Sequence, residues 1–334
     1  MSFDIKVMTR NLYVGADFQP VIRAALSDLN AVPKAAAALV AEIRASDFPA
    51  RAECLATEIA AHRPHVVGLQ EAFVLRHRKP SSLVVPPFKE ERAEAVLLDF
   101  AQVLLDCLSR RGLPYSRVVV IAGNDNQAPA GSPPALEDVR LTDGEAILVR
   151  SDLIESGIEI TESAGHVFSA HGSYGPFQDI RAWAHVDLVA SGRKLRIVTT
   201  HLQPLVTDAS AALQLAQAEA LIALHSARRD PLIVMGDFNS RADGSTTSTS
   251  RRFTEAGYVD VWAEAGEGLG LTCKAEELRD PARCFDERID YVFCRNVSKV
   301  VDAVVTGGDP MNRTASGLWP SDHGGVVATI RLAD

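Results

Sequence analysis

The chain has 334 residues, of which 47% are hydrophobic and 23% charged, so it is long enough to bury a sizeable core. Its net charge of −9 argues against an extended nucleic-acid track, because such binding depends on a basic surface. No apolar run approaches the roughly 20 residues of a membrane span, and Met1–Val7 lacks the pattern of a signal peptide. We therefore expect a cytoplasmic protein without a transmembrane segment.

The cysteines predict no disulfide framework, because there are five of them in a long chain. Cys273 and Cys284 flank a loop and are able to pair, but free thiols are favoured in a reducing compartment.

Short β-rich runs recur along the whole chain, and several of them are continuously apolar, which predicts strands covered on both faces. The predicted strands are Ile5–Thr9, His65–Gln70, Arg117–Ile121, Ala146–Val149, Ile180–Val189, Leu195–Thr200, Leu232–Gly236, Ile289–Cys294, Val300–Val305 and Val326–Ile330.

Helical stretches lie between these runs. Apolar residues at helical spacing predict a helix over Glu90–Arg110, with Gly112 just beyond its end. Arg51–His62 and Asp208–Arg228 are also predicted helices, and an Ala-rich helical insertion follows Asn11 and runs to about Ser46.

Three other segments are predicted to be surface loops. They are the basic segment Arg76–Lys79, which is also able to steer an anionic substrate, and the stretches Gly123–Pro134 and Gly244–Ser250. About ten strands interleaved with helices, with no linker or repeat, indicate an α/β fold of two packed sheets flanked by helices. We expect residues 1–334 to form one domain.

Acidic, amide and imidazole side chains stand at the ends of the predicted strands. Asn11, Glu71 and His201 each follow a strand, and Asp237 and Asn239 follow another. Asp322 and His323 precede the last strand, whereas Asp290 begins one. Taken singly, these motifs are also explained by strand-end charges, an Asx turn or a tight turn.

Together these residues indicate a metal-assisted reaction. Carboxylates and amide oxygens without thiolates suit a hard cation, Mg²⁺ or Mn²⁺, whereas zinc prefers more His or Cys ligands. Two histidines add proton transfer near neutral pH. Cleavage of a phosphoester needs such a cation, a group that activates water, and donors for the transition state.

The order of the motifs resembles that of the endonuclease/exonuclease/phosphatase superfamily. The matching motifs are Asn11, Gln70-Glu71, Thr200-His201-Leu202, Gly236-Asp237-Phe238-Asn239, Arg288-Ile289-Asp290-Tyr291 and Ser321-Asp322-His323. This resemblance implies a four-layer α/β/β/α sandwich with two central mixed sheets.

The resemblance also implies a role for each residue. Glu71 is the expected principal metal ligand, with Asn11 and Asp322 beside it. Asp237 is expected to align or activate water, and Asn239 to donate its amide N–H to a phosphoryl oxygen.

The two histidines have different implied roles. His323 is expected against the scissile phosphate, with Asp290 behind it to fix its tautomer. His201 is the expected general acid for the leaving group.

Two further assignments rest on weaker likeness. Glu145 resembles the residue that supports the first catalytic histidine in secreted deoxyribonucleases, although an exposed charge at a strand start explains it equally well. Arg181 occupies a place where family members often carry a basic residue near the substrate, and an ordinary ion pair is its alternative.

The substrate class stays open between a nucleic acid, a phospholipid and a small soluble phosphoester. Thr199-Thr200-His201-Leu202-Gln203 is similar to a block in bacterial sphingomyelinases, and the apolar segment Leu83–Phe88 is a candidate lipid-contacting loop. The long insertion after Asn11 is placed to restrict access to the site. A non-catalytic binding protein of the same fold is the alternative outside enzymes, and it predicts loss of site residues, which is not observed. No obligate protein partner is implied.

Overall fold

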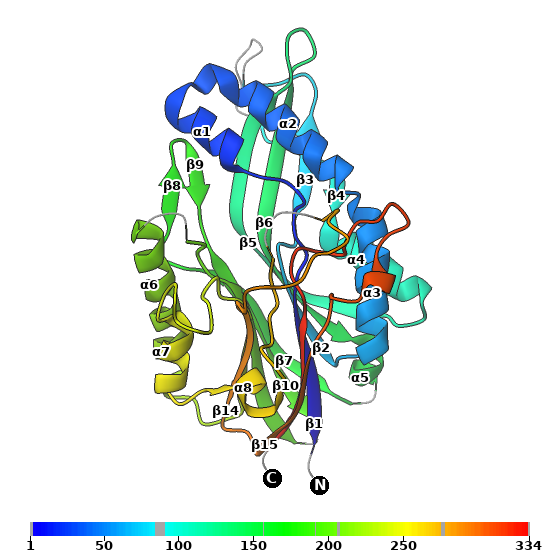
Figure 1. Ribbon diagram of the computed structural model, residues 1–334, viewed down its shortest axis with the longest axis vertical. Coiled ribbons are helices and arrows are strands. Elements are labelled where there is room, and N and C mark those ends of the chain that lie inside the picture. Colours follow the sequence, from blue (N-terminus) through cyan, green and yellow to red (C-terminus); the bar gives the residue numbers. More distant parts are fainter. Residues whose placement is uncertain are drawn as a thin grey trace.

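The computed structural model describes residues 3–83, 91–155, 157–190, 192–205, 208–274 and 278–332. Within these residues, two large sheets pack against each other, and helices cover both outer faces (Figure 1). The predicted four-layer α/β/β/α sandwich is therefore confirmed. Residues 84–88 of the expected apolar loop fall outside the described ranges.

The first sheet has the strand order β15-β16-β1-β2-β6-β3-β4, and β5 pairs with β6. β1 and β2 are parallel, whereas β16 runs antiparallel to β1. The strands of this sheet are β1 (Asp4–Asn11), β2 (Val66–Gln70), β3 (Val74–Arg78), β4 (Ala95–Asp99), β5 (Tyr115–Ala130), β6 (Glu137–Arg150), β15 (Lys299–Val305) and β16 (Val326–Arg331).

The second sheet has the order β13-β14-β12-β11-β10-β7, with β11 and β12 parallel. Its strands are β7 (Glu159–Val167), β10 (Ala182–Ala190), β11 (Arg193–His201), β12 (Leu232–Asp237), β13 (Val259–Asp260) and β14 (Asp290–Arg295). A separate hairpin consists of β8 (Gly172–Tyr174) and β9 (Phe177–Asp179).

Three buried apolar layers hold the sandwich together. One lies between the first sheet and the helices α3 and α4, the second lies between the two sheets, and the third lies between the second sheet and α6 and α7. Burial of apolar area is the main source of stability in such layers. The helices are α1 (Gln19–Ser27), α2 (Val32–Ala45), α3 (Phe48–His62), α4 (Phe100–Arg110), α5 (Ser151–Glu155), α6 (Asp208–His225), α7 (Thr249–Glu255) and α8 (Val261–Ala265), with 3₁₀ turns at Leu29–Ala31 and Pro310–Asn312.

The predicted helix Glu90–Arg110 is wrong in its first half. Residues 95–99 instead form β4, which pairs with β3, and the Asp99 side chain accepts a hydrogen bond from the Gln102 N–H at 3.0 Å. This N-cap starts the helix at Phe100, so pairing with a neighbouring strand overrides the helical spacing of the apolar residues.

Two predicted loops are also largely strand. Most of Gly123–Pro134 belongs to the long strand β5, which continues past a register shift near Ala122, and Arg76–Arg78 belongs to β3. All ten predicted strands are present, eight of them within a few residues of their expected bounds, whereas β5 ends and β6 begins nine residues beyond the predicted limits.

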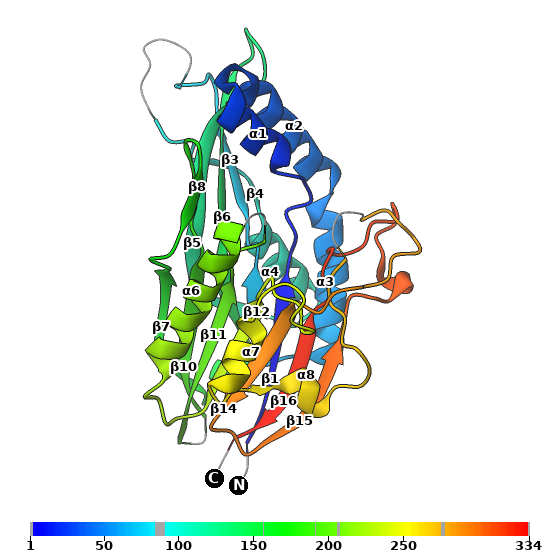
Figure 2. The same ribbon diagram turned by 60° about the vertical axis from the view of Figure 1, so that its left-hand side comes forward.

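The predicted helical insertion is confirmed as α1 and α2. These helices lie across the end of the β5–β6 hairpin, at the top of the molecule (Figures 1 and 2). None of the helices in the described ranges is both long and apolar enough to cross a bilayer. All five cysteines, including Cys273 and Cys284, are free thiols.

Candidate active site

Three neighbouring strands of the second sheet bring polar residues side by side. β11 and β12 are parallel with His201 opposite Asp237, and β14 runs antiparallel with Asp290 opposite the same Asp237. Residues that are remote in sequence therefore meet at the same end of three neighbouring strands. Because β14 runs in the opposite direction, Asp290 begins its strand while His201 and Asp237 end theirs.

The first sheet contributes the remaining residues at the same end. Asn11 and Gln70 are partners at the ends of parallel strands, and Glu71 follows directly. Because β16 is antiparallel to β1, the residues just before it, Asp322 and His323, lie at this end as well. The Asn11 amide donates across the sheets to Asp237 at 3.0 Å, which joins the two halves of the site.

The chain leaves these strands through unusual backbone conformations. Tyr13, Glu71 and Asn239 have positive φ values of 57°, 52° and 49°, which are uncommon for residues other than glycine. Gly236, just before Asp237, has φ 152°, and a Cβ there would lie 1.9 Å from the Thr200 carbonyl oxygen. This glycine allows β11 and β12 to approach closely where they deliver their functional side chains.

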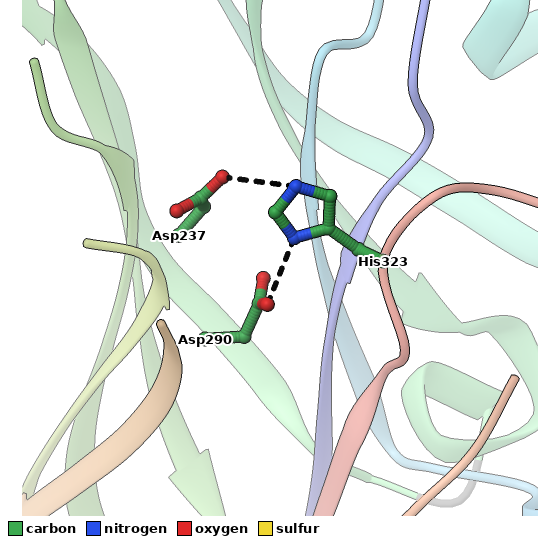
Figure 3. Close-up of side chains that lie close together, drawn as sticks. All are labelled: Asp237, Asp290 and His323. Carbon is green, nitrogen blue, oxygen red and sulfur yellow. Dashed lines mark hydrogen bonds and ion pairs between the residues drawn. The ribbon is translucent and has the colours of Figure 1, made fainter. Parts of the chain in front are cut away.

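His323 lies between two carboxylates (Figure 3). Its Nδ1 is hydrogen-bonded to Asp290 at 2.8 Å, and its Nε2 is 3.6 Å from Asp237. Among the described residues, these three groups place ligand atoms within 4.8 Å of one another, which is compact enough for a metal ion. The short Nδ1 contact, however, fits a carboxylate that orients an imidazole, as expected for Asp290 from the sequence.

The two site histidines have opposite pKa shifts. Burial alone would lower the pKa of His323, but the negative charge of Asp290, with those of Asp237 and Asp322, raises it well above its usual value. Burial and the positive charges of Arg181 and His323 lower the pKa of His201 well below its usual value. The surroundings therefore favour the protonated form of His323 and the neutral form of His201.

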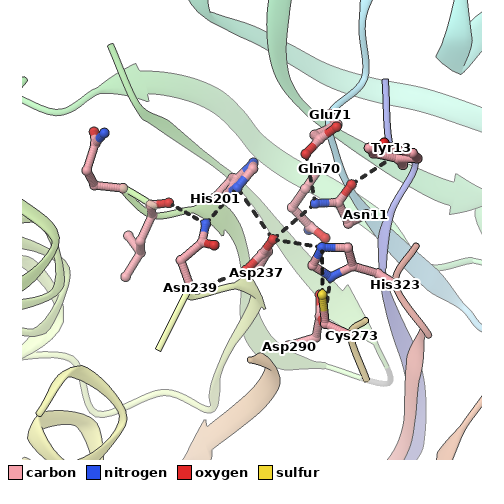
Figure 4. A network of polar contacts seen from close by, with 12 residues as sticks. Asn11, Tyr13, Gln70, Glu71, His201, Asp237, Asn239, Cys273, Asp290 and His323 are labelled. Carbon is pink, nitrogen blue, oxygen red and sulfur yellow. Dashed lines mark hydrogen bonds and ion pairs between the residues drawn. The ribbon is translucent and has the colours of Figure 1, made fainter. Parts of the chain in front are cut away.

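Asp237 is the centre of a hydrogen-bond network (Figure 4). Besides Asn11, it accepts the main-chain N–H of Asn239 at 2.9 Å, and its Oδ2 is 3.4 Å from His201 Nε2. Burial is the main reason that the pKa of Asp237 rises to about 7. A carboxyl group that titrates near neutral pH is suited to take a proton from water.

The Asn239 amide is occupied within this network. Its Nδ2 lies 2.9 Å from His201 Nε2 and 3.0 Å from the Leu202 carbonyl oxygen. Donation to a phosphoryl oxygen therefore requires one of these contacts to be replaced. His201 Nε2 thus lies between the Asn239 amide and the Asp237 carboxylate, 3.4 Å away, and the expected role of His201 as the general acid stays a prediction.

Glu71 and Asp322 form a second acidic group next to this network. The pKa of Glu71 rises to about 8, first because the carboxyl is buried and then because Asp322 and Asp143 are negatively charged. The pKa of Asp322 is also raised, mainly by burial. Asn11 donates to Glu71 at 3.2 Å, and the Val14 N–H donates to the same carboxylate at 2.8 Å.

This acidic group has the chemistry of a hard-cation site. Closely spaced buried carboxylates are costly to ionise together, and an oxygen-binding divalent cation removes that cost. Glu71 and Asp322 therefore fit the role of ligands to such a cation. Asn11 contacts the carboxylates through its N–H groups, while its Oδ1 accepts the Tyr13 N–H at 2.9 Å.

Buried arginines hold the segment that carries Asp322 and His323. Arg51 donates to the Pro320 carbonyl at 2.9 Å, Arg283 donates to the Ser321 carbonyl at 2.6 Å, and Arg10 donates to the carbonyl of His323 itself. The motifs in the sequence do not single out these arginines. The signal for Arg51 was its place on the apolar face of a predicted helix, one turn before Leu55, where a charged residue needs buried partners.

Glu145 and Arg181 lie beside the site rather than within the network. Glu145 is buried, and it accepts the main-chain N–H of His201 rather than a hydrogen bond from the imidazole. Arg181 lies 3.4 Å from Asp179 and 4.0 Å from Asp143, in the wall of the pocket. The structure thus brings both residues to the site, Glu145 through the backbone and Arg181 as part of an ion-paired wall.

A pocket of about 880 Å³ opens onto these groups. Its lining includes Glu71, His201, Asp237, Asn239, Arg181, Asp322 and His323. A volume of this size is typical of sites for small ligands.

The sequence profile of the Endonuclease/Exonuclease/phosphatase family matches residues 38–323, which contain nearly all of these site residues. The chain belongs to this family. Members of the Endonuclease/Exonuclease/phosphatase family are generally hydrolases that act on phosphoesters. Among curated proteins, none matches the chain in sequence.

Solved structures of the Endonuclease/Exonuclease/phosphatase family share the fold at low identity. A Bacteroides vulgatus family protein is 17% identical with a TM-score of 0.60, and the match covers 99% of this chain and 100% of that one. A Beutenbergia cavernae family protein is 20% identical with a TM-score of 0.59, covering 99% and 72% of the two chains. A humanized D. rerio TDP2 is 18% identical with a TM-score of 0.56, covering 98% of each chain.

Proposed function

We propose that this protein is a divalent-metal-dependent phosphoesterase, a phosphodiesterase or phosphatase, that cleaves its substrate by in-line attack of water. The proposal rests on one observation above all. Glu71, Asp237, and the adjacent pair Asp322 and His323, which come from three distant parts of the chain, face one pocket.

Glu71 and Asp322 would hold the cation, with Asn11 as a third ligand if its amide turns its oxygen toward them. Mg²⁺ or Mn²⁺ suits these oxygen donors, and when bound it would neutralise charge on the phosphoryl oxygens. The raised pKa values of both carboxyl groups are consistent with this assignment, because burial makes these groups costly to ionise and a bound cation would offset that cost.

Asp237 would orient the attacking water and accept its proton. Its buried carboxylate is fixed by Asn11 and by the Asn239 main chain, so it needs little rearrangement to do so. The water oxygen forms a new bond to phosphorus while the bond from phosphorus to the leaving oxygen breaks. The products are a phosphate with one ester bond fewer and the free alcohol.

His323 would face the phosphoryl group as an imidazolium. Asp290 keeps it protonated and oriented, so it stabilises negative charge on the phosphoryl oxygens and is the better proton donor to the leaving oxygen. His201 and Asn239, linked at 2.9 Å, would form the opposite wall and reorganise to bind a phosphoryl oxygen. Arg181 would contribute positive charge to this wall, and Glu145 would fix the backbone at His201.

A nuclease is the second candidate, because one solved structure of this fold is a D. rerio TDP2 complexed with single strand DNA product, at 18% identity. The charge of the pocket argues against it here, since seven carboxylates and two arginines line the pocket. A strand with one phosphate per nucleotide requires a more basic surface.

The test is hydrolysis of bis-p-nitrophenyl phosphate with Mg²⁺ or Mn²⁺, with and without a chelator. We expect p-nitrophenol release that stops on chelation and that falls sharply in Glu71→Gln and Asp237→Asn. The proposal fails if no metal supports turnover, or if both variants retain wild-type rates. Plasmid DNA, RNA, sphingomyelin and nucleoside monophosphates, assayed in parallel, separate the substrate classes.

A further inference from the structure

The pocket continues well beyond the catalytic groups, into a chamber under the inserted helices. Its floor is the outer half of the β5–β6 hairpin, with Ala128, Val139 and Leu141, and its roof is α1 and α2. Figures 1 and 2 show these helices lying over the end of the hairpin, away from the body of the sandwich. Since strands rise about 3.3 Å per residue, the 16-residue β5 extends far past the catalytic end of the sheet.

The wall of this chamber contains several apolar side chains beside polar ones such as Asn126, Gln127 and Gln178. On the roof side, Phe18 follows the loop that carries Tyr13, Ile22 lies on α1, and Leu39 lies on α2. Phe73 lines the chamber from the first sheet, and Phe177 lines it from the β8–β9 hairpin. Phe18, Leu39, Leu141 and Phe177 are partly buried and pack against the main core. Apolar side chains that line a cavity and keep some exposure provide surface for an apolar ligand.

The roof is fixed in place by contacts with the rest of the chain. The Gly131 N–H at the end of β5 donates to the Pro33 carbonyl of α2 at 2.9 Å. At the β8–β9 turn, a Cβ added to Gly175 would lie 3.0 Å from the Ala25 carbonyl oxygen of α1, so the hairpin packs closely on that helix. Arg51 donates to the carbonyls of Leu12 and Tyr13, which anchors the start of the insertion beside the catalytic residues. The chamber therefore exists before a substrate binds.

The charged groups of the pocket limit what such a substrate can be. Asp17 lies at the start of the insertion, and its main-chain N–H contacts Glu42 of α2 at 3.3 Å, so acidic groups lie in the roof as well as in the catalytic part. Arg181 and Arg279 are the two arginines of the lining, and Arg181 is already within ion-pair distance of Asp179. A second phosphate group, as in a nucleic acid, would therefore face more carboxyl groups than arginines in the described lining.

We propose that the chamber under α1 and α2 binds the apolar alcohol part, alkyl or aryl, of a phosphoester whose single phosphate lies at the catalytic groups. This inference rests on the proposed function and specifies its substrate class. It assigns the insertion after Asn11 as a specificity element, which selects a small amphiphilic ester over a polynucleotide.

The test uses p-nitrophenyl phosphodiesters whose second alcohol is methanol, butanol, octanol, phenol or the 5′ hydroxyl of thymidine, all below any micelle concentration and with Mn²⁺. Each fully buried methylene favours binding by about fourfold, so we expect kcat/KM to rise at least about tenfold from the methyl to the octyl ester. The phenyl ester distinguishes an aryl from an alkyl preference. A flat or falling series for both octyl and phenyl, or a preference for the thymidine ester over both, overturns the inference.

Two roof variants and one matched control test the location. Leu39→Gln and Ile22→Gln should reduce the octyl-to-methyl ratio of kcat/KM toward one. Leu29→Gln changes the same type of residue at a position 63% exposed and outside the pocket lining, and should keep the wild-type ratio. Wild-type ratios in both roof variants overturn the inference.

The chain-length series on the unmodified protein keeps the test valid if a variant does not fold. Hydrolysis of the methyl ester with no dependence on chain length refutes the apolar chamber and leaves the phosphoesterase standing. Absence of hydrolysis for every ester, with either metal, refutes the proposed function and this inference together.

Discussion

Metal binding should depend steeply on pH because Glu71 holds a proton in the metal-free protein. The pKa of its buried carboxyl is about 8, and a cation binds the ionised form, so binding below pH 8 displaces that proton. Each pH unit below the pKa costs about 1.4 kcal/mol. At pH 6 the cost is about 3 kcal/mol, which predicts an affinity about 100-fold weaker than well above pH 8.

The assay is calorimetric titration with Mn²⁺ at pH 6, 7 and 8, each in two buffers of different ionisation enthalpy. The buffer dependence gives the number of protons released, which should approach one from Glu71 at pH 6 and fall to about half at pH 8. In Glu71→Gln this proton and its share of the pH dependence should disappear, and the affinity at pH 8 should fall. Asp237, whose pKa is about 7, titrates in both proteins, so the difference between them isolates Glu71.

The matched control is Glu219→Gln on α6, whose side chain is 60% exposed. It should bind Mn²⁺ like the wild type at every pH. The reasoning is refuted if wild-type affinity is the same at pH 6 and pH 8, or if Glu71→Gln binds the ion as tightly as the unmodified protein.

The remaining predictions concern the histidine, the strand exit and stability. His323→Ala should lower kcat by about 10² or more, the usual scale for a general acid or base, and a loss of less than threefold would contradict its role. Asp290→Asn should move the alkaline limb of the pH–rate profile to lower pH, because Asp290 is the main charge that raises the pKa of His323; an unmoved limb argues against that coupling. Gly236→Ala should lower the free energy of unfolding by several kcal/mol, because the added Cβ overlaps a carbonyl oxygen. Gly112→Ala, with open space around it, should lower it by only about 1 kcal/mol. Equal losses in urea denaturation would refute the steric argument. Burial raises the pKa of Asp237 to about 7, so the folded protein loses this proton, and the stability that depends on it, as the pH rises through 7. With a chelator present, the protein should therefore melt at a lower temperature at pH 8 than at pH 5. The reverse order would contradict this reasoning.

The sequence determined the strands and the identity of the residues at their ends. Continuous apolar runs such as Leu232–Gly236 are local signals, and a side chain that follows a buried strand leaves the core at a predictable place. The four-layer fold and the family followed from these local features and from the order of the motifs.

Only the tertiary structure decided how these residues differ from one another. His201 and His323 look alike in sequence and both are buried. Burial, helped by the charge of Arg181, lowers the pKa of His201, whereas the charge of Asp290 helps to outweigh burial and raise the pKa of His323. The same holds for Ala95–Asp99, which is helical by its spacing and a strand by its pairing with β3.

The buried arginines and the chamber under α1 and α2 are also properties of long-range packing. Arg51 reaches carbonyls on either side of the site, and the insertion gains its apolar cavity only by lying on the β5–β6 hairpin. Burial, charge and enclosure depend on which distant segments come together, and local patterns along the chain do not carry that information.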